Sequence, residues 1–116
     1  MLFRSKIYED NEVAAEFVGK RKQLREILKT HGYELNDPSI FTRTELNGNF
    51  DKFLYQTVGY DKLNQLVVGL FVSAYGATSL REYFANGFEH FYIDDQAYLQ
   101  KVSPKLYRKI LSLTSK

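Results

Sequence analysis

The chain has 116 residues, of which 44% are hydrophobic and 26% are charged. This composition indicates one soluble globular domain with a modest core and excludes a disordered tail. Sixteen basic and fourteen acidic residues leave a net charge of +2, which is too small to indicate a nucleic-acid partner. The chain contains no cysteine, which excludes disulfides, thiolate zinc sites and a cysteine nucleophile and suits a reducing compartment.

The most apolar stretch, residues 63–76, is too short to span a bilayer. The N-terminal segment has no apolar run that could serve as a signal peptide. We therefore expect a protein of cytoplasmic origin that has no membrane partner.

The first predicted element is an amphipathic helix from Val13 to Lys29, because apolar residues recur there at helical spacing with charges between them. Asp10 or Asn11 is its expected N-cap. The dipeptide His31-Gly32 should end it, since glycine often follows a helix. A turn is predicted at residues 36–39, where proline follows aspartate.

The middle of the chain predicts two further helices. Asn47-Gly48 has the composition of a hairpin turn, but its flanks do not alternate as strands do. We therefore expect a loop between helices there, followed by a short helix over residues 50–59. The next helix should begin at Tyr60 or Asp61 and continue through Phe71, and its wide apolar face suggests a central position.

Three helices are predicted in the C-terminal part. Thr78 or Ser79 should cap the first of them, and a short helix should follow over residues 94–102. Pro104 should lie in the first turn of the last helix, where its missing N–H costs nothing. One broad face of the first of these helices carries Leu80, Tyr83, Phe84, Phe88 and Phe91. The predicted fold is a single all-α domain over residues 1–116, with five or six helices.

The predicted core follows from the apolar faces of these helices. It comprises Phe17, Leu24, Leu28, Phe53, Leu66, Leu70, Phe84, Phe88, Tyr98 and Leu106. Gly87 lies inside a predicted helix, where glycine costs about 1 kcal/mol. Either close packing against a neighbouring helix or room for a substrate or partner would explain it.

Residues 79–82 read Ser-Leu-Arg-Glu, which is a capping box. In this motif the Ser79 hydroxyl accepts a hydrogen bond from the backbone of Glu82, whose carboxylate bonds back to the cap. Starting a helix is therefore sufficient to explain Glu82. Tyr75, taken alone, is better explained as a core residue than as a catalytic one.

A longer pattern contains both residues. It reads Y-x6-E-YFA-x-GF-x-x-FY from Tyr75 onward, followed by an acidic spacer and YLQKVSPKLYRKI. This pattern resembles the C-terminal part of the anthrax-lethal-factor-like zinc peptidases, and most of all the versions carried in tailed-phage structural proteins. The resemblance extends from about Glu12 to Ile110 and implies the helical C-terminal subdomain of a zincin.

In that family, two histidines of an H-E-x-x-H helix bind zinc, and a later helix supplies a glutamate as third ligand. A tyrosine seven residues before that glutamate faces the metal-bound water or the oxyanion. By resemblance, Glu82 would be the third zinc ligand and Tyr75 the tyrosine. Three protein ligands and an open position are what catalytic zinc requires.

The H-E-x-x-H motif is absent from this sequence, which has two histidines, His31 and His90. His90 lies about 80° around the helix from Glu82 and is therefore off the face that Glu82 uses. His31 lies at a helix end, where its interaction with the helix dipole explains it. We therefore expect surface or cap roles for both histidines. In the family, the metal-binding helix precedes the segment that corresponds to the start of this chain. We therefore expect either the downstream half of a split or processed protein, or a degenerate copy.

Two functions of different classes follow. The first is a zincin-like structural or interaction module, catalytically inactive alone and part of a phage virion assembly. The second is the downstream half of a zinc endopeptidase whose histidine helix comes from an upstream fragment or a partner chain. The isolated chain should hold no cofactor, and zinc should bind only when an H-E-x-x-H segment completes the site.

The missing helix also predicts an uncovered surface. The residues it would pack against lie near Tyr75, Leu80 and Tyr83. An exposed apolar surface of this kind marks an interface. We therefore expect a protein partner or an upstream fragment to cover it.

Overall fold

The computed structural model describes residues 11–35, 37–93 and 96–114, and these residues form helices and connecting turns without a strand. Within these ranges the α-helices are α2 (Asn11–Thr30), α3 (Gly48–Lys52), α4 (Tyr60–Leu66), α5 (Leu80–Ile93), α6 (Gln96–Val102) and α7 (Pro104–Thr114). The 3-10 helices η1 (Pro38–Thr42) and η3 (Ala74–Ala77) and the π-helix η2 (Phe53–Val58) lie between them. The all-α prediction is confirmed.

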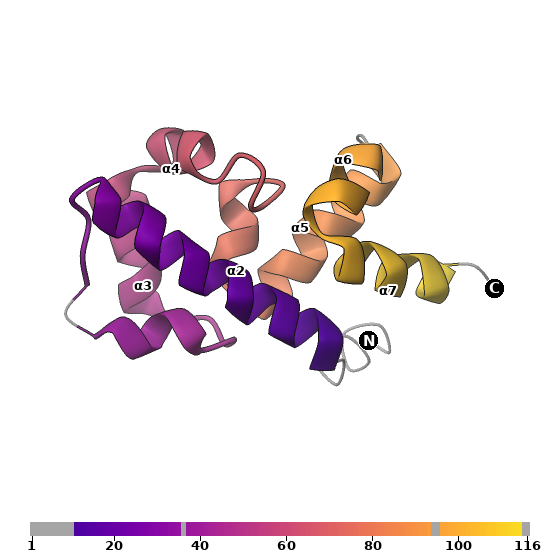
Figure 1. The fold of residues 1–116 in the computed structure, drawn as a ribbon, viewed down its shortest axis with the longest axis horizontal. Helices are drawn as coiled ribbons and strands as arrows, with labels where there is room; N and C mark the ends of the chain where they lie inside the picture. Colours follow the sequence, from indigo (N-terminus) through magenta and orange to yellow (C-terminus); the bar gives the residue numbers. More distant parts are fainter. Residues whose placement is uncertain (1–10, 36, 94–95, 115–116) are drawn as a thin grey trace.

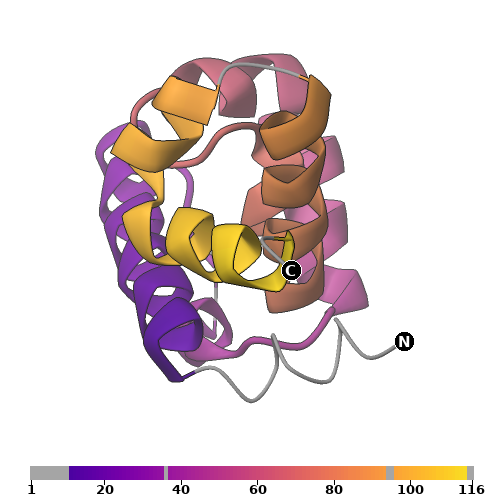
Figure 2. The same cartoon turned by 90° about the vertical axis from the view of Figure 1, so that its right-hand side faces the viewer.

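The long helix α2 runs diagonally across the molecule (Figure 1). It packs on η1, α5 and α7. In the end view, α7 crosses between α2 and α5 (Figure 2). No helix in the described part of the chain has the length and apolarity that crossing a bilayer requires.

The boundaries of α2 agree with the prediction within two residues at the start and one at the end. Beyond Thr30, the Tyr33 N–H donates to the Leu28 carbonyl at 2.8 Å, which closes the helix at the predicted place. The proposed cap Asp10 and the acidic pair at 94–95 lie outside the described residues. Asn47, in the predicted loop, caps α3 by accepting from the Phe50 N–H at 3.0 Å.

The helix predicted from residue 60 to Phe71 ends earlier than expected. The prediction that it occupies a central position is also wrong. Helix α4 ends at Leu66, and Leu63 is its one fully buried residue. A turn follows, in which Gly69 adopts φ +80°, a left-handed conformation that favours glycine. The Gly69 N–H then donates to the Tyr98 hydroxyl at 3.0 Å, so the turn is anchored to α6.

Most of the predicted core is confirmed. Phe17, Leu24, Leu28, Phe53, Leu70, Phe84 and Leu106 are buried. Leu66 and Phe88 are half-buried and pack against this core, whereas Tyr98 is half-buried and is not part of it. Tyr98 bonds to the turn at Gly69, and its neighbour Leu99 takes the buried position on α6.

Gly87 marks the closest approach of α5 to α7. A Cβ atom at this position would overlap the side chain of Leu106 and contact Ile110. The close-packing interpretation of Gly87 is therefore confirmed. The alternative, room for a substrate or partner, is wrong because Leu106 fills the space.

Replacing Gly87 with alanine should destabilise the protein by about 1–3 kcal/mol, because the added methyl group overpacks this crossing. Gly19 on α2 is the matched control, since a Cβ there meets nothing within 4 Å. Gly19→Ala should stabilise by up to about 1 kcal/mol through helix propensity alone. Thermal unfolding of both variants measures the difference, and equal shifts would contradict this account of the crossing.

Glu16 on α2 caps a helix far away in the sequence. Its carboxylate accepts the backbone N–H groups of Lys105 at 2.8 Å and Leu106 at 3.2 Å, in the first turn of α7. It also accepts the Tyr83 hydroxyl proton at 2.5 Å, and Tyr83 contacts the Ser103 hydroxyl at 2.8 Å. Burial, followed by the charge of Glu16, raises the pKa of Tyr83, so the phenol stays protonated and donates.

Lys20, one turn further along α2, is also buried. Its ammonium group donates to the Leu70 carbonyl at 2.7 Å and to the Val102 carbonyl at 2.5 Å. Burial lowers the pKa of Lys20, and the nearby Glu16 opposes that shift. This lysine therefore joins α2 to the turn after α4 and to the end of α6.

Arg21 is the largest fully buried side chain, with 1% of its surface exposed. Its guanidinium donates to the Ala77 carbonyl at 2.9 Å and the Ile40 carbonyl at 2.7 Å. It also lies 4.1 Å from the centre of the Phe50 ring. Burial lowers the pKa of Arg21 to about 10, against the opposing charges of Asp51 and Glu45, so it remains charged at neutral pH. Arg21 thus holds η1, α3 and the segment before α5 together.

Candidate functional site

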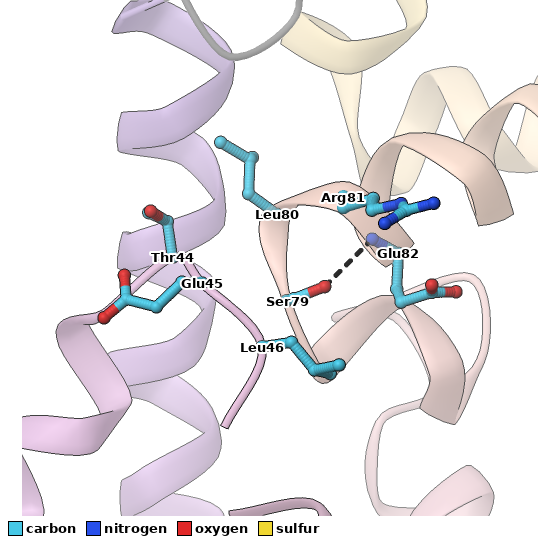
Figure 3. A pocket seen from close by; sticks show the side chains of 7 residues that line it. All are labelled: Thr44, Glu45, Leu46, Ser79, Leu80, Arg81 and Glu82. Carbon is cyan, nitrogen blue, oxygen red and sulfur yellow. Dashed lines mark hydrogen bonds between the residues drawn. The ribbon is translucent and has the colours of Figure 1, made fainter. Parts of the chain in front are cut away.

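The candidate site begins at the N-terminus of α5. The Ser79 hydroxyl accepts the Glu82 N–H at 3.1 Å, so the forward half of the predicted capping box is formed. The Glu82 carboxylate points away from Ser79 rather than back to the cap (Figure 3). Leu80 donates its N–H to the Thr44 carbonyl at 2.8 Å, which fixes the segment after η1 against the start of α5.

A surface pocket of about 440 Å³ opens between these two segments (Figure 3). It is lined by Thr44, Glu45, Leu46, Ser79, Leu80, Arg81 and Glu82. Its walls combine the leucine side chains with charged groups of both signs. Glu82 therefore stands at the edge of an accessible surface rather than inside the core.

Tyr75 lies on η3, with 58% of its surface exposed. The backbone that carries it is held on both sides. The Ala74 N–H donates to the Asn64 side-chain oxygen at 2.8 Å, and the Thr78 hydroxyl donates to the Tyr75 carbonyl at 2.9 Å. Arg21 binds the Ala77 carbonyl two residues further on. A well-anchored turn thus presents an exposed ring.

Two other tyrosines lie beside Tyr75. The rings of Tyr75 and Tyr60 are 5.1 Å apart at 68°, and those of Tyr60 and Tyr55 are 5.5 Å apart at 70°. Tyr60 is half-buried, and Tyr55 is 63% exposed. We call Tyr55, Tyr60 and Tyr75 the tyrosine cluster. Its edge-to-face contacts are the favoured arrangement for aromatic pairs.

Tyr60 is the central ring of the tyrosine cluster. Burial raises its pKa, and Asp51, Tyr75, Glu82 and Tyr55 raise it further. Tyr75 is in ring contact with Tyr60, and the charge of Glu82 contributes to the raised pKa of Tyr60.

The surface predicted near Leu80 and Tyr83 is not exposed, so that part of the partner prediction is wrong. Leu80 is 4% and Tyr83 1% exposed. The Tyr83 ring packs 5.3 Å from that of Phe17, and its hydroxyl bonds to Glu16. Helix α2 of the same chain therefore covers Tyr83, and of the three predicted surface residues Tyr75 alone is exposed.

The two histidines make local contacts. The ring Nδ1 of His31 is 2.9 Å from the Ile27 carbonyl, and that of His90 is 3.1 Å from the Asn86 carbonyl. Each partner is one turn earlier on the same helix. No group of three or more histidine, aspartate or glutamate side chains that could hold a metal ion occurs within residues 11–35, 37–93 and 96–114. Zinc at Glu82 would therefore need ligands from a segment beyond these ranges.

Comparisons with protein-family models, with curated proteins and with solved structures find no match for this chain. The function of the site is therefore inferred from its own residues and from the motif resemblance given above.

Proposed function

We propose that this chain is a protein-interaction module that is catalytically inactive alone. The observation that supports this most is the tyrosine cluster, in which Tyr55 and Tyr75 are 63% and 58% exposed. Tyrosine is enriched among the residues that dominate binding energy at interfaces. The anchored turn under Tyr75 lowers the entropy lost when that ring is buried by a partner.

The proposal also includes a zincin-like origin and a place in a phage virion. Both rest on the motif that begins at Tyr75 and continues through Glu82 into the C-terminal helices. An all-helical domain is compatible with the C-terminal subdomain of such a peptidase. The partner surface consists of the tyrosine cluster and Glu82, in place of the surface first predicted at Leu80 and Tyr83.

A second candidate function is the downstream half of a zinc endopeptidase. One observation favours it, namely that Tyr75 packs against Tyr60 and the charge of Glu82 also acts on Tyr60. One carboxylate and one phenol are too few ligands for a zinc site. An H-E-x-x-H segment of an upstream fragment or a partner chain would have to supply two histidines and the general base. The isolated chain should accordingly lose zinc during dialysis.

Site-specific photo-crosslinking in the producing host tests the proposed function. A benzophenone amino acid in place of Tyr75 should give a discrete adduct with one protein, which mass spectrometry identifies. Tyr92, 61% exposed on α5, provides the control position and should not give that adduct. A virion protein supports the first function, whereas a protein that carries H-E-x-x-H supports the second. Failure to crosslink at position 75, or the same adducts at both positions, would contradict the interaction module.

Glu82→Gln should change the stability of the isolated chain by less than about 0.5 kcal/mol. Glutamine can occupy the same position in a capping box, and the bond to Ser79 uses the backbone of Glu82 rather than its side chain. Chemical denaturation measures the change. Stabilisation by more than about 1 kcal/mol would instead show that Glu82 is an uncompensated charge, as in an emptied metal site.

A further inference from the structure

We propose that the tyrosine cluster and Glu82 bind a cationic side chain, arginine or lysine, of the partner protein. This inference rests on the proposed function, because it names the chemistry by which the interaction module recognises its partner. It follows from the geometry of the rings and from the local charge. The zincin resemblance assigned Tyr75 and Glu82 different roles, in a zinc site.

The ring geometry favours a cation over a purely apolar group. Successive rings meet at 70° and 68° rather than stacking flat on one another. Tyr55 and Tyr75, at the two ends of the cluster, are mostly exposed. A guanidinium or ammonium group is attracted to the face of a tyrosine ring within about 6 Å of its centre. Two accessible rings that flank a third offer several such faces together.

The same chain already contains an example of this chemistry. The buried guanidinium of Arg21 lies 4.1 Å from the centre of the Phe50 ring and 5.2 Å from that of Phe17. At the tyrosine cluster, Tyr55 and Tyr75 are exposed and therefore accessible to a cation of another molecule.

The local charge also favours a cation. Glu82 follows Tyr75 in one hydrogen-bonded segment, in which the Thr78 hydroxyl donates to the Tyr75 carbonyl and the Glu82 N–H donates to Ser79. The charges of Asp51 and Glu82 both raise the pKa of Tyr60. Asp51 lies near Arg21, whose charge opposes the effect of burial on the pKa of Asp51. The Glu82 side chain is not held by a hydrogen bond within the described residues. Glu82 is therefore the carboxylate available to pair with an incoming cation.

An NMR titration of the full chain tests the proposal with two acetylated peptides. One alternates glycine with arginine, and the other replaces each arginine with citrulline, which has the same shape but no charge. The arginine peptide should shift the signals of Tyr55, Tyr60, Tyr75 and Glu82 saturably, and added salt should weaken its binding. The citrulline peptide should cause much smaller shifts.

Tyr75→Leu should weaken binding of the arginine peptide about two- to fivefold, the range that corresponds to one exposed cation–π contact. Glu82→Gln should weaken it by up to about fivefold, the range that corresponds to one exposed ion pair. Tyr92→Leu, which removes a comparably exposed ring at the other end of α5, should leave binding unchanged. Two-dimensional spectra of each variant verify that it is folded. Equal binding of both peptides, absence of saturable shifts at the cluster, or equal weakening by Tyr92→Leu would each overturn the proposal.

The two proposals can fail separately. If position 75 crosslinks to a partner but the arginine peptide does not bind, the interaction module stands and its cationic specificity is wrong. If the arginine peptide binds at the cluster but no crosslink forms in the host, the site is real and the proposed function is wrong.

Discussion

Arg21→Ala is expected to lower the free energy of unfolding by about 3–5 kcal/mol, which is enough to unfold much of so small a domain. The variant leaves the carbonyls of Ala77 and Ile40 without their buried donor. It also removes the positive charge that counteracts the effect of burial on the pKa of Asp51. Unsatisfied buried acceptors lose the bond without regaining water. Urea denaturation followed by circular dichroism measures the loss.

Arg25 provides the control, because it is an exposed arginine on the next turn of α2. Arg25→Ala should stay within about 0.5 kcal/mol of the parent protein. Arg21→Lys should recover only part of the stability, since an ammonium group cannot reproduce the planar fork that reaches two separated carbonyls. A loss below about 1 kcal/mol for Arg21→Ala would show that the guanidinium is dispensable.

Phe84→Ala is the second change with a large expected effect, a loss of about 3–5 kcal/mol from the cavity that it leaves. Phe84 is 8% exposed, and its ring lies 5.7 Å from that of Phe88. Phe88 is half-buried on the same helix, so Phe88→Ala should cost distinctly less. Differential scanning calorimetry of the pair tests this order. Equal losses of stability would mean that the two rings share one environment. The assignment of Phe84 rather than Phe88 to the buried face of α5 would then be wrong.

Local signals predicted the start of α5, which is fixed locally by the Ser79 cap. Pro104 also marked the first residue of α7, although the cap of that helix comes from Glu16. The end of α4 was predicted wrongly because a distant contact, and not a local signal, fixes it. Apolar residues continue beyond Leu66 at helical spacing, but the chain turns at Gly69 and donates to Tyr98, which lies 29 residues away. A partner at that distance leaves no mark on the local pattern.

The candidate site was predictable only in part, for a similar reason. The motif singles out Tyr75 and Glu82 directly. Whether Tyr83 is exposed depends on α2, which supplies Glu16 from 67 residues away. Tyr55 and Tyr60 were missed because the contact between their rings depends on how the π-helix η2 joins α4 across Gly59, and the contact of Tyr60 with Tyr75 is long-range. π-helical segments are frequent at functional sites, but hydrophobic spacing does not predict them.

The contacts of Glu16 with α7 have a consequence for the order in which structure forms and is lost. Glu16 precedes Lys105 and Leu106, whose N–H groups it caps, by 89 and 90 positions, so during synthesis the cap exists long before the helix it stabilises. An isolated helix of 11 residues is marginal in water. Helix α7 therefore becomes stable only by docking on α2. Amide protons in its first turn should exchange with solvent as one cooperative unit with those around Glu16, and not through independent fraying of the C-terminus.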